Sequence, residues 1–155
     1  RYCEGGNDPV KITTRGRYAV MALVSLAASS RGNPVSLRDI ASQEEIPEPY
    51  LQQLFSRLRR RNLVKSIRGP GGGFLLARHP SRITIGEIIR SAEGRERESS
   101  IGCRRSGRKC GRIERCKTQG MWDALESRME EFLDSISIED LFRESPEKMP
   151  REVGA

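Results

Sequence analysis

Apolar residues recur at helical spacing along the first third of the chain, and this pattern predicts short amphipathic helices. Residues 14–29 form the first of them, which closes before Pro34. Ser36 is a good N-cap for a second, short helix that ends near residues 44 and 45. Two prolines then mark a turn at residues 46–49, because proline is tolerated at or before a helix start. A third helix is expected over residues 50–61, with an apolar stripe of Leu51, Leu54, Phe55 and Leu58 and a left-handed residue, Asn62, at its end.

Two short apolar runs follow, at residues 63–67 and 74–77, and a glycine-rich segment at residues 69–73 joins them. This pattern predicts a β-hairpin whose turn uses the positive φ that glycine adopts readily. The segment lacks the lysine and the following helix of a phosphate-binding loop, so nucleotide binding is not expected. A short helix, a tight turn, a further helix and a hairpin together predict a mostly α winged helix-turn-helix with a small β-hairpin.

Further periodic segments lie after the hairpin. Thr84 and Glu87 have the spacing of a capping box in front of a fourth helix that ends near residues 92–94. A long last helix is expected from about residue 120 to residue 137, about 27 Å in length. Its apolar positions alternate by three and four, the spacing of a coiled-coil seam, at Trp122, Leu125, Met129, Phe132 and Ile136. We therefore favour a homodimerisation helix over a stripe packed on its own domain.

Charge is distributed in blocks along the chain. The net charge is +7 over 155 residues, and residues 50–78 carry seven basic side chains and no acidic one. A cationic helix and wing suit double-stranded DNA, whose phosphates attract them. Residues 103–117 carry seven basic and one acidic side chain, whereas residues 118–155 carry four basic and ten acidic ones. Two separate basic blocks indicate two tasks rather than loose attraction to any polyanion.

Several classes of protein are excluded by what the sequence lacks. No apolar run approaches the roughly 20 residues that span a bilayer, so no membrane association is expected. Residues 19–28 superficially resemble a secretory signal, but they fit the first helix better, and we expect a cytoplasmic protein. No paired carboxylates or nucleophile–base arrangement indicates catalysis, so neither an enzyme nor a small-molecule substrate is expected.

Three cysteines lie in a segment of low apolar content, at C-x6-C-x5-C spacing: Cys103, Cys110 and Cys116. An odd number of thiols in a reducing compartment does not indicate a structural disulfide. The surrounding arginines and lysines lower thiol pKa values and favour thiolate, the form that binds metal. The gaps are wider than the paired knuckles of structural zinc, whereas iron–sulfur clusters accept thiolates from loops. Clusters usually need four ligands, and the residues alone leave the fourth open.

Three segments resemble the iron–sulfur cluster regulators of the Rrf-two family of bacterial winged-helix transcription factors. They are residues 14–20 (TRGRYAV), 50–58 (YLQQLFSRL) and 68–74 (RGPGGGF), and the similarity covers roughly residues 11–142 with the cysteines and Trp122. It implies a homodimer whose C-terminal helices cross, a [2Fe–2S] cluster on the three cysteines, and binding to promoters that include those of cluster-assembly genes. With the helix arginines, the candidate DNA-binding residues are Tyr50, Gln52, Gln53, Arg57, Arg59, Arg60 and Arg68.

Two positions depart from the pattern of that family. A histidine is expected three residues after the last cysteine, where this chain has Gln119. Gln119 is the first candidate for the fourth ligand by position, although an amide is a poor iron ligand beside thiolate or imidazole. Alternatives are an exogenous thiol or water, or one of Cys3, Glu114 and Asp123. Some relatives take a ligand from the first helix of the partner subunit, but the matching position here is Arg17, a cation. His79, the only histidine, is expected to be a surface residue. The second departure is Gln52, which replaces a glutamate and can pair with adenine.

The sequence thus divides into a flexible extension (1–10), a winged helix-turn-helix (11–95), a cysteine-rich cluster loop (96–118), a dimerisation helix (119–143) and a disordered tail (144–155). The function expected is a transcription regulator that senses iron–sulfur status. The alternative is a cluster-free redox or cysteine-metabolism regulator of the same fold, acting through its thiols or a protein partner.

Overall fold

The structure, a computed structural model, describes residues 12–94 and 117–143. Its elements in chain order are α1 (Thr14–Ser30), α2 (Leu37–Glu44), α3 (Glu48–Arg60), β1 (Val64–Ile67), β2 (Gly73–Leu76), the 3-10 turn η1 (Pro80–Arg82), α4 (Ile85–Glu93), α5 (Gln119–Ser135) and α6 (Ile138–Arg143). The expected mostly helical fold with a small hairpin is confirmed. The predicted extension, most of the cysteine loop and the predicted tail lie outside the described residues.

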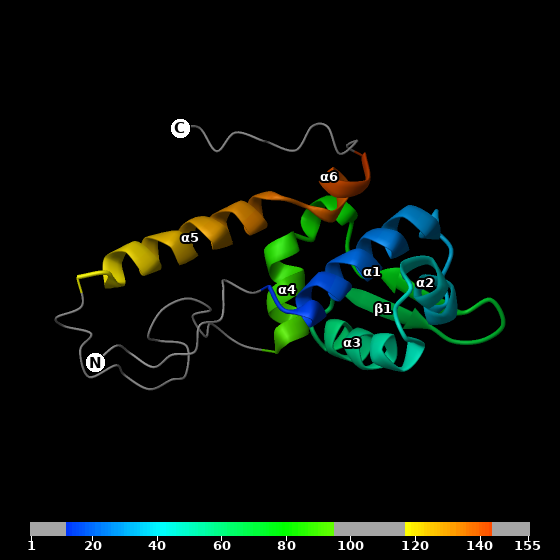
Figure 1. Cartoon of the computed structure of the whole chain (residues 1–155). Helices are drawn as coiled ribbons and strands as arrows, with labels where there is room; N and C mark the ends of the chain where they lie inside the picture. The colour runs from blue at the N-terminus through cyan, green and yellow to red at the C-terminus, as the bar shows by residue number, and fades with distance from the viewer. Residues whose placement is uncertain (1–11, 95–116, 144–155) are drawn as a thin grey trace.

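Helix α1 is the centre of the molecule, because it packs against α2, α4, α6 and β2 (Figure 1). Its inward face carries small and apolar side chains, and four of them are fully buried: Ala19, Ala22, Leu23 and Leu26. The apolar stripe of α3 enters the same core, as the sequence predicts, through Leu51, Leu54, Phe55 and Leu58. Alanines on α1 allow the neighbouring helices to approach closely, which gives the core its interdigitated packing.

The helix boundaries follow the predicted caps with one shift. Ser36 Oγ accepts a hydrogen bond from Asp39 N (3.1 Å) at the start of α2, and Glu45 ends that helix with φ 54°. Helix α3 begins at Glu48, two residues earlier than expected, because Pro47 is the N-cap and Pro49 lies in the first turn, where no N–H is needed. Asn62 follows α3 with φ 55°, the left-handed conformation expected for it.

The hairpin pairs β1 and β2 antiparallel, with Val64 opposite Leu76 and Ile67 opposite Gly73. In its turn, Gly72 N donates to Gly69 O (2.9 Å), Pro70 follows Gly69, and Gly71 has φ 72°. These are the features of a type II turn, and they confirm that the turn depends on a glycine with positive φ. The hairpin is fastened to the body through Val35, whose backbone exchanges two hydrogen bonds with Phe74 (2.8 and 3.0 Å).

Helix α4 begins at the predicted N-cap, where Thr84 Oγ1 accepts from Glu87 N (3.2 Å). The Glu87 carboxylate, expected to complete a capping box, instead accepts from Arg78 Nη2 (2.6 Å). That ion pair ties the end of the hairpin to α4. Because both side chains are about one-third exposed, its contribution to stability is small.

The predicted C-terminal helix is confirmed as α5, but it ends two residues earlier than expected, and a second helix, α6, follows it within the segment expected to be one helix. Helix α5 ends at Ser135, and Ile136 is extended (φ −104°, ψ 125°), so Ile136 does not continue the seam. Its carbonyl accepts from Ile85 N (2.9 Å), and Ile138 N donates to Ile83 O (3.0 Å). A new N-cap follows, since Asp140 N donates to Ser137 Oγ and Ser137 N donates to Asp140 Oδ2 (2.8 Å). The S-x-x-D spacing at 137–140 was the signal in the sequence for this break.

Candidate nucleic-acid interface and cluster ligand

The side of α3 opposite its apolar stripe carries polar and cationic side chains. Gln52, Gln53, Arg59 and Arg60 are all exposed there. At about 100° per residue, these four positions fall within roughly 120° of one another around the helix axis. We call this group the outward face of α3. An exposed helix face with amides and guanidinium groups has the donors and acceptors that read base edges and phosphates in a major groove.

Two predicted DNA-binding residues lie apart from the outward face. Arg57 Nη1 donates to the carbonyl oxygen of Ala92 (3.3 Å), so the guanidinium group lies at the C-terminal end of α4. A cation there is favourable, because the last carbonyls of a helix carry partial negative charge. The ring of Tyr50 packs edge-on against Tyr18 of α1, with ring centroids 5.7 Å apart. Both side chains therefore position α3 within the body, and we leave them out of the proposed DNA contacts.

The wing carries the remaining predicted DNA-binding residue, Arg68. It follows β1 directly and is exposed, as is Lys65 within that strand. The loop that joins β1 to β2 projects from the edge of the molecule (Figure 1). The structure thus has the two parts that a winged-helix protein presents to DNA, an outward helix face and a cationic hairpin.

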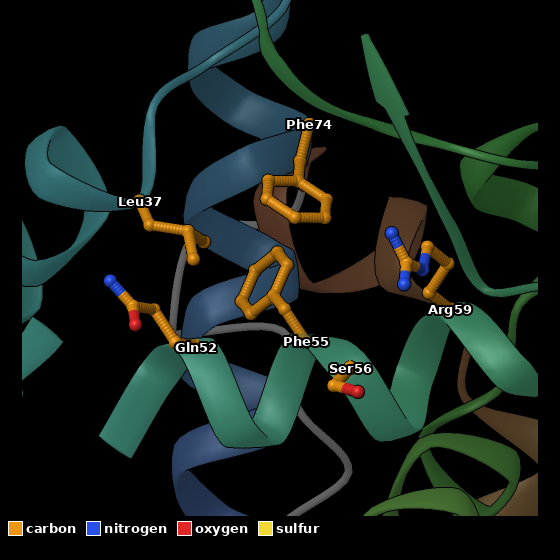
Figure 2. A pocket seen from close by; sticks show the side chains of 6 residues that line it. All are labelled: Leu37, Gln52, Phe55, Ser56, Arg59 and Phe74. Carbon is orange, nitrogen blue, oxygen red and sulfur yellow. The ribbon is translucent and has the colours of Figure 1, made fainter. Parts of the chain in front are cut away.

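A hollow of about 290 Å³ opens beside the outward face. Figure 2 shows Phe55 rising from α3 toward Phe74, with Leu37 approaching from α2. The two phenyl rings meet edge to face, with centroids 5.0 Å apart. Gln52, Ser56 and Arg59 complete the lining. Sequence reasoning missed Leu37, Ser56 and Phe74, because residues from three separate elements meet only in the folded chain.

Gln119 is buried at the start of α5, with 9% of its surface exposed. Its amide Nε2 donates to Asp123 Oδ1 (2.7 Å), one turn further along the helix. Since a carboxylate only accepts, the amide orientation is determined, and Oε1 points away from that bond. Among the described residues, Oε1 has no hydrogen-bond partner. A buried acceptor without a donor costs free energy, on the order of 1–3 kcal/mol.

Most of the other candidate ligands cannot be compared with Gln119, because the described residues do not include them. Cys103, Cys110, Cys116, Cys3 and Glu114 lie outside the described residues. Within residues 12–94 and 117–143, no three His, Cys, Asp or Glu side chains meet in a group that could hold a metal ion. His79 is exposed and caps η1, where its Nδ1 accepts from Ser81 N (3.3 Å). This agrees with the expectation that His79 is a surface residue.

Helix α5 projects away from the helices packed around α1 (Figure 1). Three of its large apolar side chains are substantially exposed: Met121 (56%), Leu125 (39%) and Phe132 (48%). The C-terminal end of α5 is held to α4 by Asp134, which accepts from Arg90 Nη2 (2.7 Å) and from Thr84 Oγ1 (3.3 Å). Among the described helices, none is long and apolar enough to cross a membrane.

This fold and the outward face of α3 define a winged-helix DNA-binding protein. Residues 12–144 match the model of the Rrf2 (Rrf-two) family, described as an iron-dependent transcriptional regulator. The chain belongs to the Rrf2 family of transcription regulators, which confirms the expected resemblance. Its relatives in that family are regulators and not enzymes.

Named relatives make the comparison more specific. The HTH-type transcriptional regulator IscR of Xenorhabdus nematophila is 43% identical over 135 residues, which cover 86% of this chain and 80% of the relative. The solved structure of T. potens IscR has a TM-score of 0.71 at 36% identity and covers 92% of this chain and 93% of its own. CymR, the global cysteine regulator of B. subtilis, also has a TM-score of 0.71, at 38% identity over 84% of this chain and 95% of its own.

Proposed function

We propose that this protein senses iron–sulfur status through a [2Fe–2S] cluster and controls promoters of cluster-assembly genes as a homodimer. Cys103, Cys110 and Cys116 supply three ligands, and Gln119 Oε1 supplies the fourth. The observation that carries the proposal is the buried Oε1 of Gln119, three residues after Cys116, which has no hydrogen-bond partner within residues 12–94 and 117–143. The description of the family as an iron-dependent transcriptional regulator supports an iron-containing cofactor.

The donor set fits a cluster chemically. Thiolates are the usual ligands of iron–sulfur clusters, and a carbonyl oxygen completes the set as a weaker, harder ligand. Asp123 would act as the outer partner that orients the fourth ligand, because it accepts from the amide nitrogen and leaves the oxygen free to bind. When bound, the cluster would supply a redox-active group held by the three cysteines and Gln119.

Anaerobic reconstitution with iron and sulfide tests the cluster. The wild-type protein should be coloured and contain two iron and two sulfide per chain for the [2Fe–2S] form. Cys103→Ala, Cys110→Ala and Cys116→Ala should each lose the visible absorbance. Three variants that all keep the colour would show that the cysteine assignment is wrong.

A matched pair of variants tests the fourth ligand. Gln119→His should slow the loss of the cluster in air, because imidazole binds iron better than an amide does. Gln119→Leu should speed the loss, and Asp123→Asn should do so by roughly tenfold, as for other outer-shell partners. Cys3→Ala is the control and should behave like the wild type. If Cys3→Ala bleaches the protein and Gln119→Leu does not, Cys3 is the fourth ligand.

Salt dependence tests the proposed DNA face. Arg59→Ala, Arg60→Ala and Arg68→Ala should each weaken binding and reduce the slope of log affinity against log salt by about one. Arg57→Ala is the matched control on the same helix, since its guanidinium group lies on α4, and its salt slope should stay that of the wild type. Binding isotherms at four salt concentrations measure both effects. An unaltered slope in all three surface variants would exclude this face as the phosphate contact.

A second candidate is a cluster-free regulator of the same fold. It is favoured by the solved structure of CymR, a cysteine regulator, which matches this chain with the same TM-score as T. potens IscR. In that case the loop cysteines would act as thiols. A colourless, iron-free protein after reconstitution, together with a mass increase under mild peroxide, would favour this second function.

A further inference from the structure

The hollow beside the outward face of α3 has no part in phosphate attraction, because its floor is apolar. We propose that it receives the C5 methyl group of a thymine, so that the protein reads one T·A pair in each half-site by apolar contact. This inference rests on the proposed binding of DNA through α3 and the wing. It adds a specificity determinant that the basic side chains alone cannot supply.

The chemistry of the floor selects the occupant. Leu37 of α2 and Phe74 of β2 are half-buried and present carbon to the opening, and the fully buried Phe55 of α3 lies beneath them, against Phe74. A phosphate or a hydrated ion would lose its water there without compensation. The thymine methyl is the one apolar group that base pairs display in the major groove, and it gains free energy when it is covered.

The two polar side chains at the rim of the hollow indicate how the hollow would lie against the base pairs. Gln52 and Arg59 both line it and both are exposed. They are separated by seven residues, or about 10.5 Å along the helix axis. Since base pairs are stacked at about 3.4 Å, this distance spans roughly three base pairs. Gln52 is thus placed to pair with an adenine near the thymine, whose methyl group enters the hollow between the two polar side chains.

The charge around the opening favours DNA over a small apolar ligand. The hollow opens on the face that carries the exposed Arg59 and Arg60, and Arg60 Nη2 lies 3.5 Å from Ser56 Oγ at the rim. A polyanion is attracted to such a rim, whereas an uncharged apolar molecule gains nothing from it.

Replacing thymine by deoxyuridine tests the proposal, because it removes only the methyl group and leaves every hydrogen-bonding group in place. The full-length protein first selects duplexes from a random pool. Each thymine of the selected site is then replaced singly. We expect one thymine in each half-site to lose about fourfold in affinity on replacement, the equivalent of one buried methylene. Other positions should change by less than about 1.5-fold.

Protein variants locate the effect. In the Leu37→Ala protein, replacing the thymine by deoxyuridine should no longer reduce the affinity for DNA, so that the ratio of the two affinities approaches one. The slope of log affinity against log salt should stay that of the wild type. Met21→Ala is the control, because Met21 is an exposed apolar residue of α1 outside the hollow, and it should keep the fourfold loss. Thermal unfolding checks that both variants are folded; Phe74→Leu replaces Leu37→Ala if the latter is not.

Two negative results have different meanings. If the protein selects a site and no thymine replacement costs more than about 1.5-fold, the hollow does not read a methyl group, although DNA binding stands. The same conclusion follows if folded Leu37→Ala and Phe74→Leu proteins keep the full loss. If the protein selects no duplex with or without a cluster, the proposed function itself fails, and this inference fails with it.

Discussion

The winged-helix body buries its large apolar side chains, whereas the C-terminal helix α5 leaves several of its own exposed to solvent. In the body, residues from α1, α3 and α4 meet in one core, and Leu23, Phe55 and Ile88 are fully buried. On α5, Leu125 and Phe132 remain substantially exposed, although their spacing is that of a buried seam. Within the described residues, the body therefore buries its apolar side chains in one core, whereas α5 exposes an apolar surface of the kind that marks interaction sites.

The boundary between the two regions is a short stretch of well-defined contacts. Gly86 of α4 faces Asp134 of α5 so closely that a Cβ at Gly86 would collide with the Asp134 carboxylate. Ile138, the first residue of α6, then enters the core and has no exposed surface. The chain thus approaches the body along the exposed length of α5, is fastened at Asp134, and enters the core at α6. What covers α5 decides the assembly, and a second copy is the occupant we propose.

Placing a charge on the exposed seam should have the largest effect. Phe132→Asp in a homodimer removes one phenyl contact per chain, and each contact stabilises by about 1.5–3 kcal/mol. The two symmetry-related losses together should weaken dimerisation by roughly 10²- to 10⁴-fold. Sedimentation equilibrium of the purified protein measures the change in mass.

The matched control on the same helix is Glu131→Gln, an exposed polar position that should leave the dimer intact. Thermal unfolding of monomeric Phe132→Asp should still show a cooperative transition, because the core of the body is separate from the seam. A wild-type protein that sediments as a monomer at micromolar concentration would contradict the proposed role of α5 in dimerisation.

Loss of the anchor at α6 should have the next largest effect. Ile138→Ala leaves a cavity in the shared core and should lower the free energy of unfolding by about 2–5 kcal/mol. Phe142→Ala is the comparison, because Phe142 is an exposed residue of the same helix, and it should cost less than about 1 kcal/mol. Urea unfolding measures both. Equal costs for the two variants would mean that α6 is not docked through Ile138.

The smallest expected effect concerns the cap that ends the seam. Hydrogen bonds from the backbone and then the side chain of Ser137 hold the pKa of Asp140 below its ordinary value. Its ionised form is favoured in the folded chain, so the stabilisation is present above the ordinary pKa and is lost as the pH falls through the lowered one. Melting temperatures measured from pH 6 down to pH 3 should fall less in Asp140→Asn than in the wild type. Parallel curves for the two proteins would contradict this role for Asp140.

Local signals in the sequence were sufficient for most of the body. Ser36, Thr84 and Asn62 cap helices where their residue types predicted, because capping depends on side chains and backbone within a few residues. The same reasoning failed at Ile136, whose apolar character fits the seam. There the backbone pairing of Ile136 and Ile138 with Ile83 and Ile85, far away in sequence, ended the helix.

The sequence predicted the helix of the candidate DNA site, but it could not predict which side chains of that helix contact other helices. Residue types and spacing identified Gln52 and Arg59 on a helix that suits DNA. They could not separate Arg57 from that group, because its partner Ala92 lies on another helix. The orphaned oxygen of Gln119 was equally invisible, since burial is a property of the packed chain.

The amino-acid sequence by itself determined the class of this protein: a basic winged helix-turn-helix with a cysteine-rich segment and an apolar C-terminal seam. Periodicity, caps and glycine turns are local, and they persist in any packing of the chain. The tertiary structure alone decided which side chains share the DNA face, which apolar groups line a hollow beside it, and where the seam stops. Those outcomes depend on contacts between residues distant in sequence, which form only when the core closes around α1.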